Sequence, residues 1–99
     1  MSEDNFKAEV EQTVQLYEKL THYAAIRTRQ MIAELGEVEA LSRLMVSADL
    51  KKGFKVLRDN GRLAKTFEAL VVRFGHLFKT EVVEAAQWRL DHPQHLQRG

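Results

Sequence analysis

Residues 4–35, DNFKAEVEQTVQLYEKLTHYAAIRTRQMIAEL, contain neither glycine nor proline and decide the fold class of this chain. Nine mostly apolar side chains recur along the stretch: Phe6, Val10, Val14, Tyr17, Leu20, Ala24, Thr28, Met31 and Leu35. Their eight steps cover 29 residues, so the mean step is close to the helical period of ~3.6 residues. The pattern predicts one long amphipathic helix over residues 4–35. We expect it to end at Gly36, because glycine adopts the left-handed conformation that closes many helices.

Four shorter helices are predicted after this stretch from the same three- and four-residue spacing of apolar side chains. Their expected bounds are about 38–46, 48–59, 64–74 and 80–91. The pair Asn60-Gly61 favours a turn after the second of them, and Gly75 ends the third. Pro93 prevents the last helix from continuing.

The sequence also suggests which residues cap two of the helices and which apolar residues lie in the last connector. Ser47 or Asp49 is the candidate cap of the helix at 48–59, and Thr80 is the candidate cap of the last helix, because such side chains accept bonds from free backbone amides. Leu77 and Phe78 are expected to act as apolar plugs in the connector between the last two helices.

No segment alternates polar and apolar residues as a half-buried strand would. With 99 residues and 44% hydrophobic side chains, the chain can build one modest core. We therefore predict an all-α fold, in which one long N-terminal helix is followed by about four short helices packed as a small orthogonal bundle. This single domain spans residues 1–92, and residues 93–99 form a flexible tail.

Composition restricts the function classes. The chain has no cysteine, so disulfides, thiolate nucleophiles and thiolate metal sites are excluded. No basic segment followed by an apolar run begins the sequence, and no stretch approaches the ~20 apolar residues of a membrane span. We expect a cytoplasmic protein with no contact to a membrane.

The length of the predicted first helix suggests assembly. A helix of 32 residues would be about 48 Å long, whereas a compact domain of this size has a diameter of roughly 34 Å. Either the helix bends or breaks near Thr21 and His22, or its first turns are solvated, or a partner covers it. A homodimer or a docked protein partner would then contact Val10, Val14, Leu16, Tyr17, Leu20, Tyr23 and Ala24.

The net charge of +1 conceals a basic middle segment. Residues 1–42, 43–79 and 80–99 carry net charges of −4, +6 and −1. A basic segment either forms a solvated face or contacts an anionic partner such as DNA or RNA. The candidate phosphate-binding residues on and after the helix at 48–59 are Lys51, Lys52, Lys55, Arg58, Arg62 and Lys65.

This alternative predicts that Lys55→Glu combined with Arg58→Glu abolishes nucleic-acid binding without lowering the melting temperature. A helix-turn-helix arrangement around residues 38–74 is conceivable. The segment that would read DNA, FEALVVRF at residues 67–74, is mostly apolar and is interpreted as core.

No local pattern of residues predicts catalysis, a cofactor or a metal. Four histidines are present at 22, 76, 92 and 95, but His92 and His95 flank a proline and do not share a helical face, which argues against a zinc site. Ser, His and Asp do not occur together in a nucleophile motif. The sequence therefore predicts a non-enzymatic binding or assembly module that self-associates or docks on a protein through its N-terminal helix, with nucleic-acid binding as the alternative and no small-molecule substrate.

Overall fold

The structure, a computed structural model, describes residues 2–45 and 49–93, and its regular secondary structure over those residues is all helical. The α-helices are α1 (Ser2–Thr21), α2 (Ile26–Leu35), α3 (Glu37–Met45), α4 (Asp49–Asp59), α5 (Phe67–Arg73) and α6 (Thr80–Asp91). Two short 3-10 helices, η1 (Leu63–Lys65) and η2 (Gly75–Leu77), flank α5. The predicted all-α class is confirmed.

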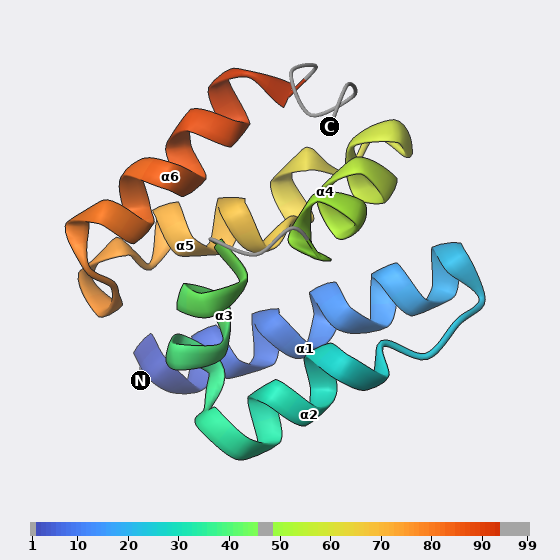
Figure 1. Cartoon of the computed structure of the whole chain (residues 1–99), viewed down its shortest axis with the longest axis horizontal. Helices are drawn as coiled ribbons and strands as arrows, with labels where there is room; N and C mark the ends of the chain where they lie inside the picture. The colour runs from blue at the N-terminus through green and yellow to red at the C-terminus, as the bar shows by residue number, and fades with distance from the viewer. Residues whose placement is uncertain (1, 46–48, 94–99) are drawn as a thin grey trace.

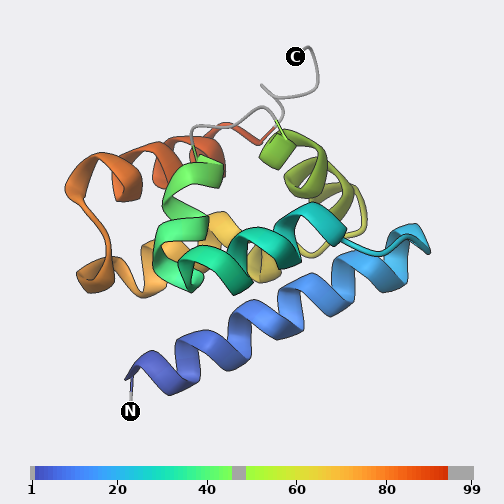
Figure 2. The same cartoon turned by 60° about the horizontal axis from the view of Figure 1, so that its bottom comes forward.

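The predicted single helix over residues 4–35 is wrong, because the chain leaves the helix after Thr21 and begins α2 at Ile26. The alternative of a break near Thr21 and His22 is confirmed. His22 takes a positive φ of 64°, a conformation that ends a helix. The Thr21 hydroxyl donates to the Tyr17 carbonyl oxygen at 2.9 Å and accepts from the Tyr23 amide at 3.3 Å, so a side chain stabilises the turn in place of the helical ladder. In Figures 1 and 2, α2 folds back along α1.

An ion-pair cluster fixes α2 to α1 across this turn. Glu18 accepts hydrogen bonds from the Ala25 amide at 2.7 Å and from Arg29 at 2.7 and 2.9 Å. Arg29 also reaches Glu11 at 3.1 Å. These bonds hold the pKa of Glu18 at about 2, chiefly through Arg29.

Glu18→Gln is expected to loosen the turn while leaving the core intact, because a neutral amide accepts more weakly from Arg29. We expect faster hydrogen exchange at the Ala25 amide and a lower Tm, with little change at core amides such as that of Leu70. Unchanged exchange at Ala25 would show that the turn does not depend on this carboxylate. Glu34→Gln, the same change at an exposed carboxylate of α2, is the matched control.

The fold-back removes the length mismatch on which the prediction of self-association rests. A 20-residue α1 is about 30 Å long, and the whole chain measures 34 × 29 × 20 Å with a radius of gyration of 12.3 Å. Helix α1 runs across the molecule beneath α2, α4 and α5 (Figure 2) and has no long overhang.

The main core lies between α1, α3, α5 and α6. Its buried side chains are Phe6, Val10, Val14, Leu41, Leu44, Met45, Phe67, Leu70, Val71 and Ala86. The Phe6 ring packs against Phe74 at 5.2 Å and edge-on against Phe78 at 5.7 Å between centroids. Leu77 and Phe78 pack against this core, as predicted for apolar plugs.

The helix ends predicted at glycines are observed, whereas the predicted capping residues differ from those in the structure. Gly36 and Gly61 have φ of +85° and +71°, as their predicted positions after helices require. The helix expected at 64–74 is instead η1 followed by α5, with Thr66 accepting from the Ala69 amide at 3.1 Å. Thr80 is the first residue of α6 and not its cap.

Asp49 likewise begins α4 as its first residue. Ser47 and the predicted tail beyond Pro93 lie outside the described residues.

Candidate ligand pocket

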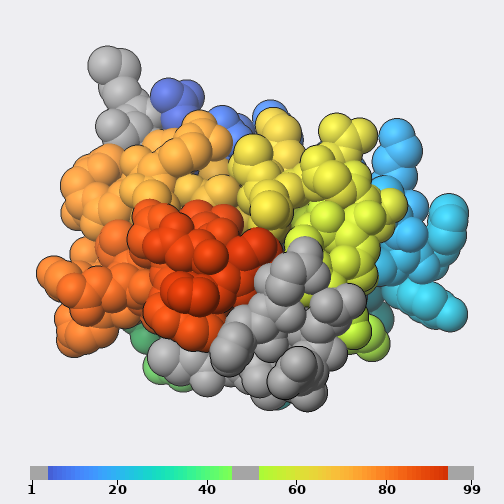
Figure 3. Space-filling view, turned by 90° about the horizontal axis from the view of Figure 1, so that it is seen from above, coloured from blue at the N-terminus to red at the C-terminus, as the bar shows by residue number. Residues whose placement is uncertain are grey.

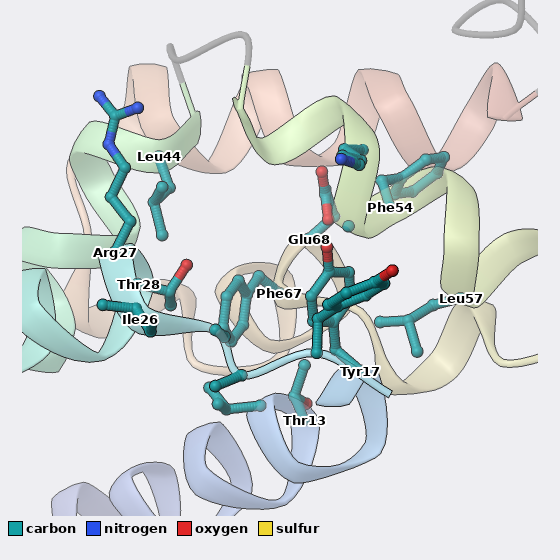
Figure 4. A pocket seen from close by; sticks show the side chains of 16 residues that line it. Thr13, Tyr17, Ile26, Arg27, Thr28, Leu44, Phe54, Leu57, Phe67 and Glu68 are labelled. Atoms are coloured by element: carbon teal, nitrogen blue, oxygen red, sulfur yellow. The ribbon is translucent and has the colours of Figure 1, made fainter. Parts of the chain in front are cut away.

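A pocket of about 440 Å³ lies between the second half of α1, the turn at residues 22–25, the start of α2, the end of α3, and helices α4 and α5. Figure 4 shows side chains from these elements converging on it. The principal apolar wall consists of Tyr17, Ile26, Leu44, Phe54, Leu57 and Phe67. Phe54 and Leu57 are almost fully buried, at 1% and 3% exposure, so α4 presents a fixed apolar face to the pocket.

Gly53, inside α4, leaves one part of the pocket wall without a side chain. A Cβ added there would meet Cε1 and Cδ1 of Tyr17 at 3.9 and 4.0 Å, which is ordinary van der Waals contact. Packing therefore does not require glycine at this position, although glycine inside a helix costs about 1 kcal/mol relative to alanine. The missing side chain keeps space open beside the Tyr17 ring.

Glu68 is the buried ionisable group of this pocket. Its side chain is 1% exposed, and Arg89 of α6 donates from Nη1 to Oε2 at 3.1 Å. The second oxygen, Oε1, is buried without a hydrogen-bond partner. Burial raises the pKa of Glu68 to about 7, against the opposing effects of its own backbone amide and of Arg89. A carboxyl group held in this way in a pocket is a frequent mark of a binding or reactive site.

Two exposed apolar side chains and two basic side chains also line the pocket. Tyr23 and Ile26 are 77% and 65% exposed and line the pocket from the turn and from the start of α2. Arg27 and Lys52 also line the pocket. Figure 3 shows α4 lying between α6 and the projecting end of α1 with its turn.

The predicted partner-contact residues of the N-terminal helix separate into two groups. Val10 and Val14 are 1% and 2% exposed and belong to the core, so they are not available to a partner. The chain itself covers them, because α1 packs against α4 and α5. The remaining predicted contacts are at least partly exposed: Leu16, Tyr17, Leu20, Tyr23 and Ala24. Of these, Tyr17, Tyr23 and Ala24 line the pocket.

Among the candidate phosphate-binding residues, Arg58 is buried and not available to a ligand. Its side chain is 4% exposed, its Nε donates to Asp59 at 2.9 Å, and its Nη1 donates to the Pro93 carbonyl at 2.7 Å. This arginine joins the end of α4 to the segment after α6 and is not available to bind a phosphate. The other described candidates are exposed: Lys52, Lys55, Arg62 and Lys65. The side chain of Lys51 lies outside the described structure.

Comparison of the chain with known protein families, curated proteins and solved structures finds no significant match. In the part of the chain that the structure describes, no three histidine or acidic side chains gather as a possible metal site. No helix within residues 2–45 or 49–93 combines the length and apolar character needed to cross a membrane. The function is therefore inferred from the pocket.

Sequence reasoning did not find this pocket, because its residues come from separate helices and the turn brings them together. Glu68 carried one usable signal: it is the acidic residue within the apolar run FEALVVRF. A charge on an otherwise apolar helix face must either be paired or serve a site.

Proposed function

We propose that this chain is a non-catalytic binding protein that holds an apolar small molecule in the pocket between α1, α4 and α5. The observation that carries the proposal is a pocket left open beside Gly53, where packing permits a larger residue. Its volume of about 440 Å³ lies within the range of small-molecule sites, which are mostly apolar with a few polar groups.

Two substitutions at Gly53 test the proposal with the neutral fluorescent dye N-phenyl-1-naphthylamine. Gly53→Ala should raise the free energy of unfolding by about 0.5–1 kcal/mol and still bind the dye. Gly53→Leu should fill the space beside Tyr17 and weaken dye binding about 10-fold or more, because the ligand and the new side chain exclude each other. Fluorescence titration gives the affinity, and urea unfolding gives the stability.

The two variants separate a blocked pocket from an unfolded protein. A stable Gly53→Leu variant that no longer binds the dye supports the site. Equal affinity of the wild type and Gly53→Leu would place the dye elsewhere and contradict the proposal. Absence of saturable dye binding to the wild type would also contradict it.

Docking on a protein partner stays a proposal, but fewer of the predicted contact residues are available to it, because Val10 and Val14 are buried. The exposed Tyr23 and Ile26 support it, since aromatic and large apolar side chains are common at interface centres. Its self-association form lacks the expected helix overhang. A monomeric mass by light scattering at tens of micromolar protein would remove that form.

Nucleic-acid binding also stays an alternative proposal. It rests on the exposed Lys52, Lys55, Arg62 and Lys65, which could contact phosphates with release of counterions. Fluorescence anisotropy with labelled duplex DNA and single-stranded RNA at several salt concentrations tests it. Absence of binding at low salt would contradict it.

A further inference from the structure

The chemistry of Glu68 narrows the class of ligand. Its Oε1 is a buried acceptor to which no other residue donates, and an unmade hydrogen bond on a buried polar atom is costly. A carboxylate oxygen accepts hydrogen bonds and donates none when it is ionised. A group that satisfies Oε1 must therefore be a donor.

The charge balance around Glu68 selects a neutral donor over a cation. Arg89 already pairs with Oε2 at 3.1 Å, so the ionised pair has no net charge. A second cation beside it would bring an uncompensated positive charge into a buried place, which is strongly unfavourable. Hydroxyl groups and the N–H of an aromatic ring or amide donate without that penalty.

The surroundings of Glu68 determine the rest of the ligand. The residue lines the same pocket as Phe54 and Phe67, and Figure 4 shows it among these rings. Aromatic walls favour a flat, apolar frame. Because Oε1 is shielded from water, the donor has to enter between the side chains that now cover this oxygen.

We propose that the ligand is a neutral, flat apolar molecule bearing one hydroxyl or N–H donor, and that Glu68 Oε1 accepts this hydrogen bond. This inference rests on the proposed function, because it assumes that the pocket is the binding site. It assigns Glu68 a role in ligand selection and Arg89 the role of positioning the carboxylate.

Indole and indene form a matched pair of probes, because they share shape and differ in the ring N–H. Displacement of N-phenyl-1-naphthylamine at about pH 8, where Glu68 is ionised, measures the affinity of each. We expect indole to bind about 10-fold tighter or more, since hydrogen bonds to charged groups are the stronger class.

The double variant Glu68→Met/Arg89→Met removes the acceptor and keeps an apolar filling. Replacing a buried ion pair by apolar side chains of similar size is commonly tolerated, and circular dichroism with a thermal melt checks that the variant folds. The affinity ratio of indole to indene should fall to about one.

Equal affinity of the wild type for the two probes would overturn the donor assignment and leave the apolar pocket standing. A preference for indole that persists in the double variant would also overturn it. If the wild type does not bind even the dye, the proposed function itself fails.

Discussion

Between about pH 5 and about pH 8, the free energy of unfolding is expected to fall by about 2–3 kcal/mol. The cause is Glu68, whose pKa is raised from 4.5 to about 7 by burial. Within this interval the folded chain binds more protons than the unfolded chain, so stability decreases as pH rises. The stabilisation is complete below the unfolded pKa and is lost as pH passes the folded one.

Other carboxylates produce the opposite slope in acid. The pKa values of Glu9, Glu11 and Glu18 are lowered, in each case first by a hydrogen bond from an arginine. Their stabilisation is present above the unfolded pKa and is lost as pH falls toward the folded values. Stability should therefore be greatest near pH 5. Urea unfolding followed by circular dichroism across the pH range measures this profile.

Glu68→Gln is the decisive control for the neutral limb of the profile. Glutamine has nearly the shape of the protonated glutamic acid and does not titrate, so the stability of the variant should be almost constant from about pH 5 to about pH 8. At the higher pH it should exceed the wild type by about 2–3 kcal/mol, the amount that the wild type has lost. A variant that keeps the wild-type slope would assign the pH dependence to another group.

Arg89 opposes this shift of the Glu68 pKa without removing it. Arg89 approaches from α6, while Arg27 and Lys52 line the same pocket from α2 and α4. The attraction of Arg89 lowers the pKa of Glu68, but the loss of hydration is larger. A buried ion pair of this kind is weak support for stability.

Periodicity in the sequence predicted the helical class because each apolar stripe reports burial along one helix face. It could not detect the break after Thr21, since α1 and α2 both face the same interior and the spacing continues across the turn. Histidine is no strong signal for a helix end, and the turn at His22 is evident only from its positive φ in the structure. Gly36 and Gly61 were predictable because the need for positive φ is local.

The candidate sites depended on contacts between distant segments, which a single sequence does not display. Val10 and Val14 were assigned to a partner because no covering helix was evident for an extended first helix. Arg58 was assigned to a basic face because its spacing from Lys55 is helical, although a three-residue step on a helix turns by about 300° and here brings Arg58 to the buried side. The Pro93 carbonyl that receives Arg58 lies 35 residues away.

Arg58→Glu should destabilise the fold by about 3 kcal/mol or more, which corrects the sequence-based prediction that reversing this charge leaves stability unchanged. A carboxylate at this buried position would face the Pro93 carbonyl and the Asp59 side chain, both of which now accept from the arginine. Acceptors would then meet acceptors in a place shielded from water. We expect Tm to fall by more than about 12 °C.

Lys55→Glu is the matched control, because it makes the same charge change on the same helix at an exposed side chain. Its effect on the free energy of unfolding should stay within about 0.5 kcal/mol. Equal losses of Tm in the two variants would contradict the assignment of Arg58 to the contact between α4 and the end of α6. Because Lys55→Glu leaves the fold intact, it is the substitution that tests nucleic-acid binding, whereas any loss of binding in Arg58→Glu would follow from unfolding.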